Sequence, residues 1–232
     1  EENVEYDFVT RDWTGENLAF ELKSHPPLHS LGSLRDGWFY LQDPSTLFAA
    51  TLLAAQPSET IWDMCAAPGG KTTFIAQLMK NEGKIVASDI EPNRLKLVKE
   101  NCARLGVTCV ESVPNLQPTI RNPQFDRILI DAPCSNTGVL RRRVDLRWRI
   151  SEPEISRLRK TQLDLLNQAA AQLKPGGILV YSTCSLEPEE NTEIIQQFLV
   201  ANASFRLETE RQLLPFADGV DGAYVARLKR ST

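Results

Sequence analysis

Short apolar segments alternate with longer segments of helical pattern along most of this chain, and this alternation constrains the fold more than any other feature. The segments that read as strands are Thr60–Met64, Lys84–Ser88, Val107–Val110, Phe125–Ile130, Ile178–Thr183, Phe205–Glu208 and Ala223–Leu228. The segments that read as helices are Pro44–Ala55, Lys71–Met79, Pro92–Leu105, Ile155–Leu173 and Pro188–Val200. Strands that alternate with helices of this length form βαβ units and a parallel sheet. The sequence therefore predicts an α/β fold whose ligands bind beyond the carboxyl ends of the strands.

The bulk composition fits one large domain, or one domain with a small appendage. The chain has 232 residues, and 42% of them are apolar, which is enough for a sizeable core. No apolar run approaches the length of a membrane span, and no signal-peptide pattern occurs. Five cysteines without a C-x-x-C pair indicate neither a disulfide framework nor a zinc site. Because reduced thiols fit the cytoplasm, we expect a cytoplasmic monomer without a membrane or metal partner.

A glycine-rich turn at residues 65–71 joins the strand Thr60–Met64 to its helix. Glycines let the backbone approach a ligand closely, and a helix N-terminus favours negative charge. The turn ends in Gly-Lys-Thr as a P-loop does, but Cys65 stands where the first P-loop glycine belongs, which argues against an NTPase. In the other interpretation, Asp89 at the end of the next strand accepts hydrogen bonds from ribose hydroxyls. Asp89 could also simply cap the following helix, and both roles can coexist.

Two cysteines follow the ends of apolar strands. Cys134 closes an Asp-Ala-Pro-Cys motif, and Cys184 lies in a Ser-Thr-Cys-Ser motif. A parallel sheet delivers both thiols to the same crevice, and two thiols there imply covalent chemistry, with one sulfur attacking and the other assisting. Free cysteine is also a common small core residue. We apply that interpretation to Cys102 and Cys109.

A basic stretch follows the first of these motifs. Residues 141–160 contain eight basic and three acidic side chains, although the whole chain has a net charge of −4. Such asymmetry is typical of contact with a phosphate backbone, and a solvated helix face is the alternative. Trp148 could stack on an unpaired base or wedge into the core. The residues that we expect to bind nucleic acid are Arg141, Arg142, Arg143, Arg147 and Arg149.

Taken together, three motifs closely resemble those of the RNA cytosine-C5 methyltransferase family. They are Asp63–Thr72, Asp131–Gly138 and Tyr181–Ser185, in this order. The segments 40–45 and 188–191 also resemble the family, and the match runs from about Gly37 to Leu228. The bacterial Sun (Fmu) type, which modifies small-subunit ribosomal RNA, is the most similar. The resemblance implies a class I S-adenosylmethionine-dependent methyltransferase, which is a Rossmann-like, mostly parallel seven-stranded sheet with helices on both faces.

The resemblance also implies roles for individual residues. Cys184 would be the nucleophile, Cys134 would assist product release, Asp131 would contact the cytosine ring or the cofactor, and Lys71 would lie beside the target base. The sequence alone does not rank the two thiols. DNA cytosine methyltransferases place the attacking thiol in Pro-Cys, so the swapped assignment stays open. The residues expected to bind S-adenosylmethionine are Cys65, Ala66, Ala67, Pro68, Gly69, Gly70, Lys71, Asp89 and Asp131.

The chemistry explains why these residue types occur together. C5 of cytosine is too weak a carbon nucleophile to take a methyl group directly, and addition of a thiolate to C6 converts C5 into an enamine carbon. Cysteine suits this task because some thiolate exists near neutral pH. An acid such as Asp131 can protonate or hydrogen-bond N3. We therefore expect methyl transfer to a cytosine in RNA, with small-subunit (16S) ribosomal RNA as the expected substrate. Transfer RNA methylation and a non-catalytic cofactor-binding scaffold are the alternatives. An amino-group methyltransferase would show Asn/Asp-Pro-Pro-aromatic instead of Asp-Ala-Pro-Cys.

Two departures from the family pattern carry consequences. No acidic residue stands at Pro114 or Asn115, where the family usually places one near the adenine end of the cofactor. We expect weaker cofactor binding there, or a substitute hydrogen bond from Asn115. We also expect the N-terminal RNA-binding region that Sun-type proteins usually carry to be missing, which would leave cofactor binding intact and weaken RNA binding. We expect residues 1–36, which are polar and irregular, to be a remnant of that region, and residues 37–232 to form the catalytic domain.

Overall fold

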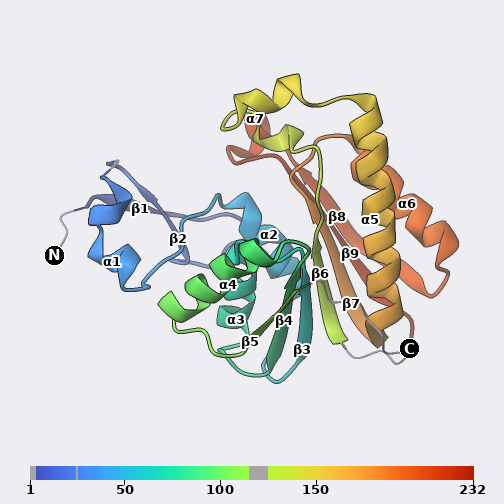
Figure 1. The fold of residues 1–232 in the computed structure, drawn as a ribbon, viewed down its shortest axis with the longest axis horizontal. Coiled ribbons are helices and arrows are strands. Elements are labelled where there is room, and N and C mark those ends of the chain that lie inside the picture. The colour runs from blue at the N-terminus through green and yellow to red at the C-terminus, as the bar shows by residue number, and fades with distance from the viewer. Residues whose placement is uncertain (1–3, 25, 115–124) are drawn as a thin grey trace.

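The computed structural model describes residues 4–24, 26–114 and 125–232. Within these ranges, one sheet of seven strands has the order β5-β4-β3-β6-β7-β9-β8 (Figure 1). The strands are β3 (Thr60–Met64), β4 (Lys84–Asp89), β5 (Val110–Pro114), β6 (Phe125–Asp131), β7 (Leu173–Thr183), β8 (Phe205–Leu213) and β9 (Ala223–Arg230). The pairs from β5 to β7 are parallel, and β9 runs antiparallel to both of its neighbours. The predicted fold class is confirmed.

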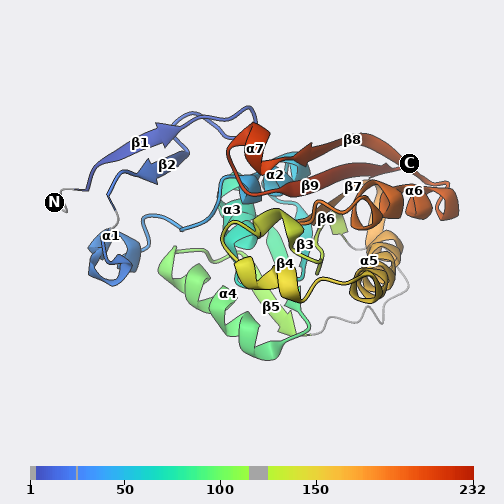
Figure 2. The same cartoon turned by 90° about the horizontal axis from the view of Figure 1, so that it is seen from above.

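Helices cover both faces of this sheet (Figures 1 and 2). One face is covered by α2 (Ser45–Leu53), α3 (Gly70–Leu78) and α4 (Pro92–Arg104), and the other by α5 (Glu152–Gln172) and α6 (Thr192–Ala201). Side chains alternate between the faces along each strand. Accordingly, Ile61 packs with α2 and α3, whereas its neighbour Trp62 packs with α5 and α6. Cys102 is buried beside β4 and Cys109 packs against the core, so both behave as the expected core residues.

Some boundaries differ from the predicted ones. Strand β5 begins at Val110, where the strand Val107–Val110 was expected to end, because residues 107–109 form the turn that leaves α4. Strand β7 begins at Leu173, so residues 174–177 lie in the strand instead of ending a helix. Helix α5 begins three residues early, at Glu152. The helix expected from Pro188 is divided into the 3-10 turn η4 (Pro188–Glu190) and α6, because Asn191 adopts a non-helical backbone conformation.

The first forty residues are more ordered than expected. Strands β1 (Tyr6–Val9) and β2 (Ala19–Leu22) pair as an antiparallel hairpin beside the main domain (Figure 2). Between them, Trp13 is buried in the main core, and its indole N–H donates to the carbonyl of Pro44 at 2.9 Å. Residues before 37 therefore contribute to the core of the large domain. The remaining short helices are η1 (Leu28–Ser30), α1 (Gly32–Arg35), η2 (Thr137–Val139), η3 (Val144–Trp148) and α7 (Pro215–Asp218).

The helices and the possible metal-ligating side chains of the described ranges bear on membrane and metal partners. No helix there combines the length and the apolar character that crossing a membrane requires. No group of three or more His, Cys, Asp or Glu side chains in the same ranges has an arrangement that could hold a metal ion.

Candidate active site

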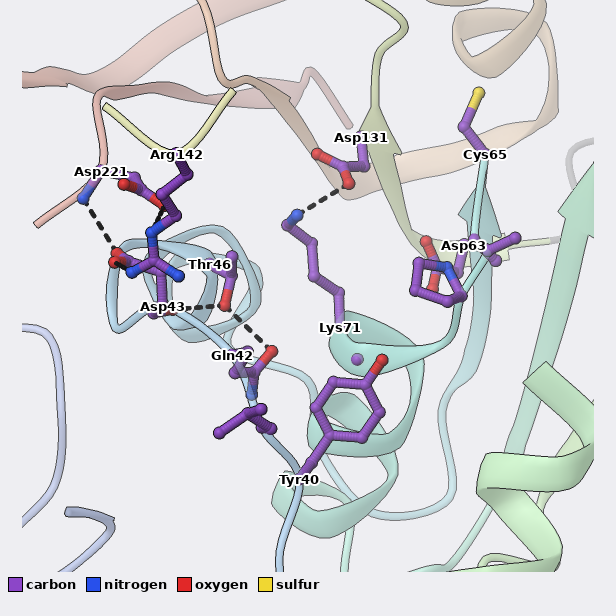
Figure 3. A pocket seen from close by; sticks show the side chains of 15 residues that line it. Tyr40, Gln42, Asp43, Thr46, Asp63, Cys65, Lys71, Asp131, Arg142 and Asp221 are labelled. Carbon is purple, nitrogen blue, oxygen red and sulfur yellow. Dashed lines mark hydrogen bonds and ion pairs between the residues drawn. The ribbon is translucent and has the colours of Figure 1, made fainter. Parts of the chain in front are cut away.

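A cavity of about 240 Å³ opens at the carboxyl ends of β3 and β6 (Figure 3). Its wall is completed by the segment that leads into α2 and by the connection between β8 and β9. The lining residues are Tyr40, Leu41, Gln42, Asp43, Thr46, Asp63, Cys65, Ala66, Ala67, Pro68, Gly70, Lys71, Asp131, Arg142 and Asp221. Of the residues predicted to bind the cofactor, Gly69 and Asp89 lie behind this lining.

The glycine-rich turn is shaped by close packing on two sides. Gly69 has a φ of 107°, a conformation that favours glycine. A Cβ on Gly70 would lie 2.8 Å from the ring of Tyr40 and 2.9 Å from Oε1 of Gln42. A side chain at position 70 would therefore displace the side chains of Tyr40 and Gln42, because the segment before α2 packs directly on the turn.

Asp89 stabilises the turn from behind. Its Oδ2 accepts a hydrogen bond from the backbone N–H of Ala67 at 3.2 Å, and its Oδ1 accepts one from Glu91 N at 3.0 Å. Arg94 donates to the carbonyl of Ala67 and lies 3.6 Å from Asp89 Oδ2. Asp89 therefore holds the turn before α4 but does not cap that helix, whose N-cap position is Glu91 and has no side-chain cap hydrogen bond. Pro114, the position without the expected acid, pairs in register with Asp89 across β4 and β5, whereas Asn115 lies outside the described residues.

Lys71 and Asp131 form an ion pair in the cavity, with Nζ 2.7 Å from Oδ2 (Figure 3). Lys71 rises from the first turn of α3, and Asp131 ends β6. Burial lowers the pKa of Lys71, but the charge and hydrogen bond of Asp131 outweigh it, with a smaller contribution from the charge of Cys184, so the pKa is raised. Lys71 is therefore held as a cation at the edge of the sheet where the thiols lie.

Asp63 is a site residue that the sequence did not single out. It is completely buried at the end of β3, and its Oδ2 accepts a hydrogen bond from the Thr72 hydroxyl at 2.5 Å. Its Oδ1 is buried without a hydrogen-bond partner. Burial, together with the charge of Asp131, raises the pKa of Asp63 to about 7 against the opposing hydrogen bond from Thr72.

The orphaned Asp63 oxygen fits the expected cofactor. S-adenosylmethionine carries a cationic amino group and a carboxylate at one end and ribose hydroxyls at the other. An unpaired carboxylate oxygen suits the amino group, and the backbone at the start of α3 suits an anion. The residues of the glycine-rich turn therefore fit this cofactor.

The two thiols meet as the spacing predicted. Residues 131 and 182 pair in register across β6 and β7, and the chain beyond them brings Cys134 Sγ to 3.4 Å from Cys184 Sγ. The Cys184 thiol donates to Oδ1 of Asn136 at 2.9 Å, while Asn136 Nδ2 donates to the carbonyl of Cys134 at 2.7 Å. The hydrogen bond with Cys184, burial and the nearby charges of Cys184 and Glu190 raise the pKa of Cys134 well above its ordinary value. Cys134 is therefore a protonated thiol at neutral pH.

The third cysteine of the site has a different character. Burial and the charges of Asp131 and Asp89 raise the pKa of Cys65 to about 12. Cys65 has a φ of 60° and lines the cavity. It is a neutral wall residue and no nucleophile at neutral pH.

The five arginines predicted to bind RNA divide into two groups. Arg141 and Arg142 both pair with the buried carboxylates of Asp43 and Asp221, at 2.5 to 3.1 Å. Figure 3 shows Arg142 beside these two carboxylates. Both arginines make these ion pairs with about half of each side chain exposed, and Arg142 also lines the cavity. Arg143, Arg147 and Arg149 are exposed, and Trp148 is 85% exposed, which excludes a tryptophan wedged into the core.

Other functional residues escaped the sequence reasoning. Asp43, which no motif assigned to the site, accepts hydrogen bonds from Ser45 N, from Asp221 N and from both arginines. Asn136 and Glu190 hold the thiols and their loops. The segments that contain them stood out only because of a cysteine or because they resemble segments of the methyltransferase family. Contacts between segments 48 or more residues apart decide these roles, and no local sequence pattern encodes such contacts.

The parallel sheet with β9 antiparallel, the glycine-rich turn and the acid at the end of β4 define a class I methyltransferase fold. Residues 50–229 match the family described as 16S rRNA methyltransferase RsmB/F. The chain belongs to this family, whose members are S-adenosylmethionine-dependent RNA methyltransferases.

The chain is 41% identical over 220 residues to the ribosomal RNA small subunit methyltransferases B of Shigella sonnei and Escherichia coli O139:H28. These matches cover 90% of this chain and 51% of each relative, so the chain spans about half the length of the curated relatives. Two Pyrococcus horikoshii structures are 32% identical. NSun6 with SFG has a TM-score of 0.82 and matches 94% of this chain and 60% of its own. A methyltransferase homolog has a TM-score of 0.84, and the match covers 99% of this chain and 79% of the homolog's chain.

Proposed function

We propose that this chain transfers a methyl group from S-adenosylmethionine to C5 of a cytosine in RNA, through a covalent bond between Cys184 and C6 of the base. The observation that carries the proposal is the pair of thiols 3.4 Å apart at the same sheet edge as the Lys71–Asp131 ion pair. Simple methyl transfer to an amino group needs no thiol, so this arrangement favours covalent activation of a carbon atom.

The protonation states support the order of roles. The raised pKa of Cys134 disfavours its thiolate, and Cys184 is the less buried of the two thiols, so the attack on C6 is assigned to Cys184. The cationic Lys71 and the Asp131 carboxyl group would hydrogen-bond the ring edge and take up the electron density that moves toward N3. When the product leaves, water in the open cavity takes up the C5 proton, and the C5–H electrons form the C5–C6 double bond. The electrons of the C6–S bond return to Cys184, whose sulfur accepts a hydrogen bond from the Cys134 S–H.

The cofactor would occupy the cavity beside the glycine-rich turn. When bound, it supplies an electrophilic methyl group. Asp63 would hold its amino group, the N-terminal turn of α3 its carboxylate, and Asp89 the ribose hydroxyls. The solved relative NSun6 contains SFG, an analogue of S-adenosylmethionine, which supports this assignment.

Small-subunit ribosomal RNA is the proposed substrate, because the curated relatives are named for it. A cytoplasmic location follows from that substrate. We further propose that residues 37–232 supply the catalytic machinery and that residues 1–36 border an RNA-binding region. We also propose that the chain acts as a monomer. Arg143, Arg147 and Arg149 are exposed and would contact phosphates, whereas Arg141 and Arg142 would shape the cavity.

A trapping experiment tests the covalent chemistry. Wild type, Cys134→Ser and Cys184→Ser are incubated with S-adenosylmethionine and unmodified small-subunit ribosomal RNA, and protein–RNA adducts are resolved on a denaturing gel. We expect an adduct to accumulate in Cys134→Ser, because release is slowed, and to be absent in Cys184→Ser, because no bond to C6 can form.

The other outcomes are equally informative. An adduct that accumulates only in Cys184→Ser would exchange the roles of the two thiols. Methyl transfer to transfer RNA but not to ribosomal RNA would change the substrate class. Absence of methyl transfer and of adducts in every variant, with cofactor binding retained in calorimetry, would favour a non-catalytic scaffold.

A further inference from the structure

Glu190 is a completely buried acid beside the two thiol loops. It lies in η4, six residues beyond Cys184. Its carboxylate accepts hydrogen bonds from the Ser135 backbone N–H at 3.0 Å, from the Ser135 hydroxyl at 2.5 Å and from the Ser185 hydroxyl at 2.6 Å. Ser135 follows Cys134, and Ser185 follows Cys184. One carboxylate therefore joins the residues that directly follow both thiols.

Gln162 extends this contact to the other side of Cys134. Its side chain is fully buried on α5, and its Nε2 donates both to Glu190 Oε1 at 3.0 Å and to the carbonyl of Pro133 at 2.9 Å. Both chain neighbours of Cys134 are therefore fixed by the Glu190–Gln162 pair, whereas the thiol itself faces Cys184.

The hydrogen-bond partners of Glu190 suit a carboxylate. The Ser135 backbone N–H and the Gln162 amide N–H donate to it, and both serine hydroxyls are able to donate to it. These partners (Ser135, Ser185 and Gln162) are neutral, so they leave the negative charge in place near Cys134. Such a charge favours the protonated form of a neighbouring thiol.

We propose that Glu190, held by Gln162, is the positioning residue that sets the two thiols in register and keeps the proton on Cys134, leaving Cys184 to attack. The inference rests on the proposed covalent function and assigns it a residue that touches neither substrate nor sulfur. The titratable groups that face Cys134 are Cys184, Glu190 and the buried Tyr181. The Tyr181 hydroxyl donates to the Glu190 carbonyl at 2.8 Å, so it is neutral.

The test is the pH profile of Cys134 alkylation, which needs no RNA. Wild type, Glu190→Gln and Glu193→Gln are treated with iodoacetamide between pH 7 and 11, and the rate at Cys134 is followed by peptide mass spectrometry. Glu193 is a suitable control because it is an acid near the start of α6 that pairs with Arg159 on the surface. We expect Glu190→Gln to shift the midpoint of the profile down by about one pH unit, which is roughly tenfold more thiolate below the midpoint. Glu193→Gln should retain the wild-type midpoint.

A folded Glu190→Gln variant with an unchanged midpoint would overturn the inference. The midpoint is used instead of the absolute rate because greater exposure of the thiol would change the rate without moving the midpoint. A shifted midpoint in a protein that methylates no RNA would retain the role of Glu190 and reject the proposed function.

A second variant covers the case in which Glu190→Gln does not fold. Gln162→Leu removes the contact with Pro133 but keeps the charge of Glu190. We expect an unchanged alkylation midpoint, together with a kcat for methyl transfer that falls at least tenfold and an unchanged dissociation constant for S-adenosylmethionine. A wild-type kcat in this variant would show that the pair does not position the Cys134 loop.

Discussion

Asp63 shows how a single side chain can link the stability of this protein to its cofactor. Its carboxyl group is completely buried, one oxygen has no partner, and its pKa is raised to about 7. In the unfolded chain the same group titrates near 3.9. Between these values the folded state binds more protons than the unfolded state, so stability falls as pH rises from about 4 to about 7 and stays reduced above it.

We predict that Asp63→Asn raises stability relative to wild type by up to a few kcal/mol above pH 7 and by clearly less at pH 5. The amide keeps an acceptor for Thr72 and removes the buried charge. The same variant should bind S-adenosylmethionine at least tenfold more weakly, because a carboxylate no longer meets the amino group. Thermal unfolding at pH 5 and pH 8, with calorimetry at pH 8, measures both effects.

Asp145→Asn is the control, because Asp145 lies half exposed on η3. It should change neither quantity. A stability difference for Asp63→Asn that is equal at pH 5 and pH 8 would contradict the raised pKa.

At the residue scale, sequence reasoning found the side chains that lie inside recognisable motifs. Lys71, Asp131 and both thiols lie where the strand ends predicted. Asp63, Asn136 and Glu190 were not assigned roles from the sequence. Their roles depend on burial and on hydrogen-bond partners, which only the folded structure shows. Glu190, for example, acts on Ser135, which is 55 positions away. For the arginines, a local count of charges gave all five the same role. Such a count cannot reveal that Asp43 and Asp221 pair with two of them.

At the scale of elements, two glycines let the loops beyond the strands approach one another. Gly138, in η2, donates its N–H to the Cys184 carbonyl at 2.9 Å, and its own carbonyl accepts from Gly222 N at 2.9 Å. A Cβ on Gly138 would lie 2.8 Å from the Cys184 carbonyl oxygen and closer still to that of Gly222. Three loops are thus packed backbone against backbone.

We predict that Gly138→Ala destabilises the fold by about 1–3 kcal/mol, since backbone atoms must move to admit the methyl group. It should also slow adduct formation, because the Cys184 loop is displaced. Urea unfolding measures the first effect and the trapping gel the second. Gly15→Ala is the matched control, since its Cβ would meet only Leu18 at 3.9 Å. Equal stabilities of the two variants would show that the loops move to admit the methyl group without a loss of folding free energy.

The elements themselves were largely predictable, because strand and helix periodicities and turn residues are local signals. The errors fall where local signals conflict with tertiary pairing. Lys174–Gly177 contains proline and glycine and was expected to end a helix, but pairing with β6 begins at Leu173. The β1–β2 hairpin was missed because its side chains are largely exposed and carry little hydrophobic contrast.

At the scale of the whole molecule, Trp13 connects the N-terminal region to the sheet domain. Its ring lies 5.6 Å from that of Phe48, and the Arg211 guanidinium stacks 5.0 Å above it. Its carbonyl accepts from the Thr51 hydroxyl at 3.0 Å. The segment before residue 37 is therefore attached to α2, the helix that follows the Asp43 wall of the cavity.

We predict that Trp13→Ala lowers the free energy of unfolding by about 3–5 kcal/mol, as expected for a buried aromatic residue in a core. Cofactor affinity should fall with it, because the start of α2 loses its contact. Trp38→Ala should change stability by less than about 0.5 kcal/mol, since Trp38 is 81% exposed. Chemical denaturation of both variants gives the comparison. A small loss for Trp13→Ala would mean that the N-terminal region folds apart from the sheet.

The closeness of the two thiols also determines how the site would respond to peroxide. Cys184 is only partly buried, whereas Cys134 is buried behind it at 3.4 Å. Oxidation of Cys184 gives a sulfenic acid, and a neighbouring thiol condenses with it to a disulfide with loss of water. We therefore expect oxidative damage to stop at a bond that dithiothreitol can reverse, before the irreversible sulfinic acid forms. The geometry that serves covalent chemistry on a base would in this way also protect the sulfur that performs it.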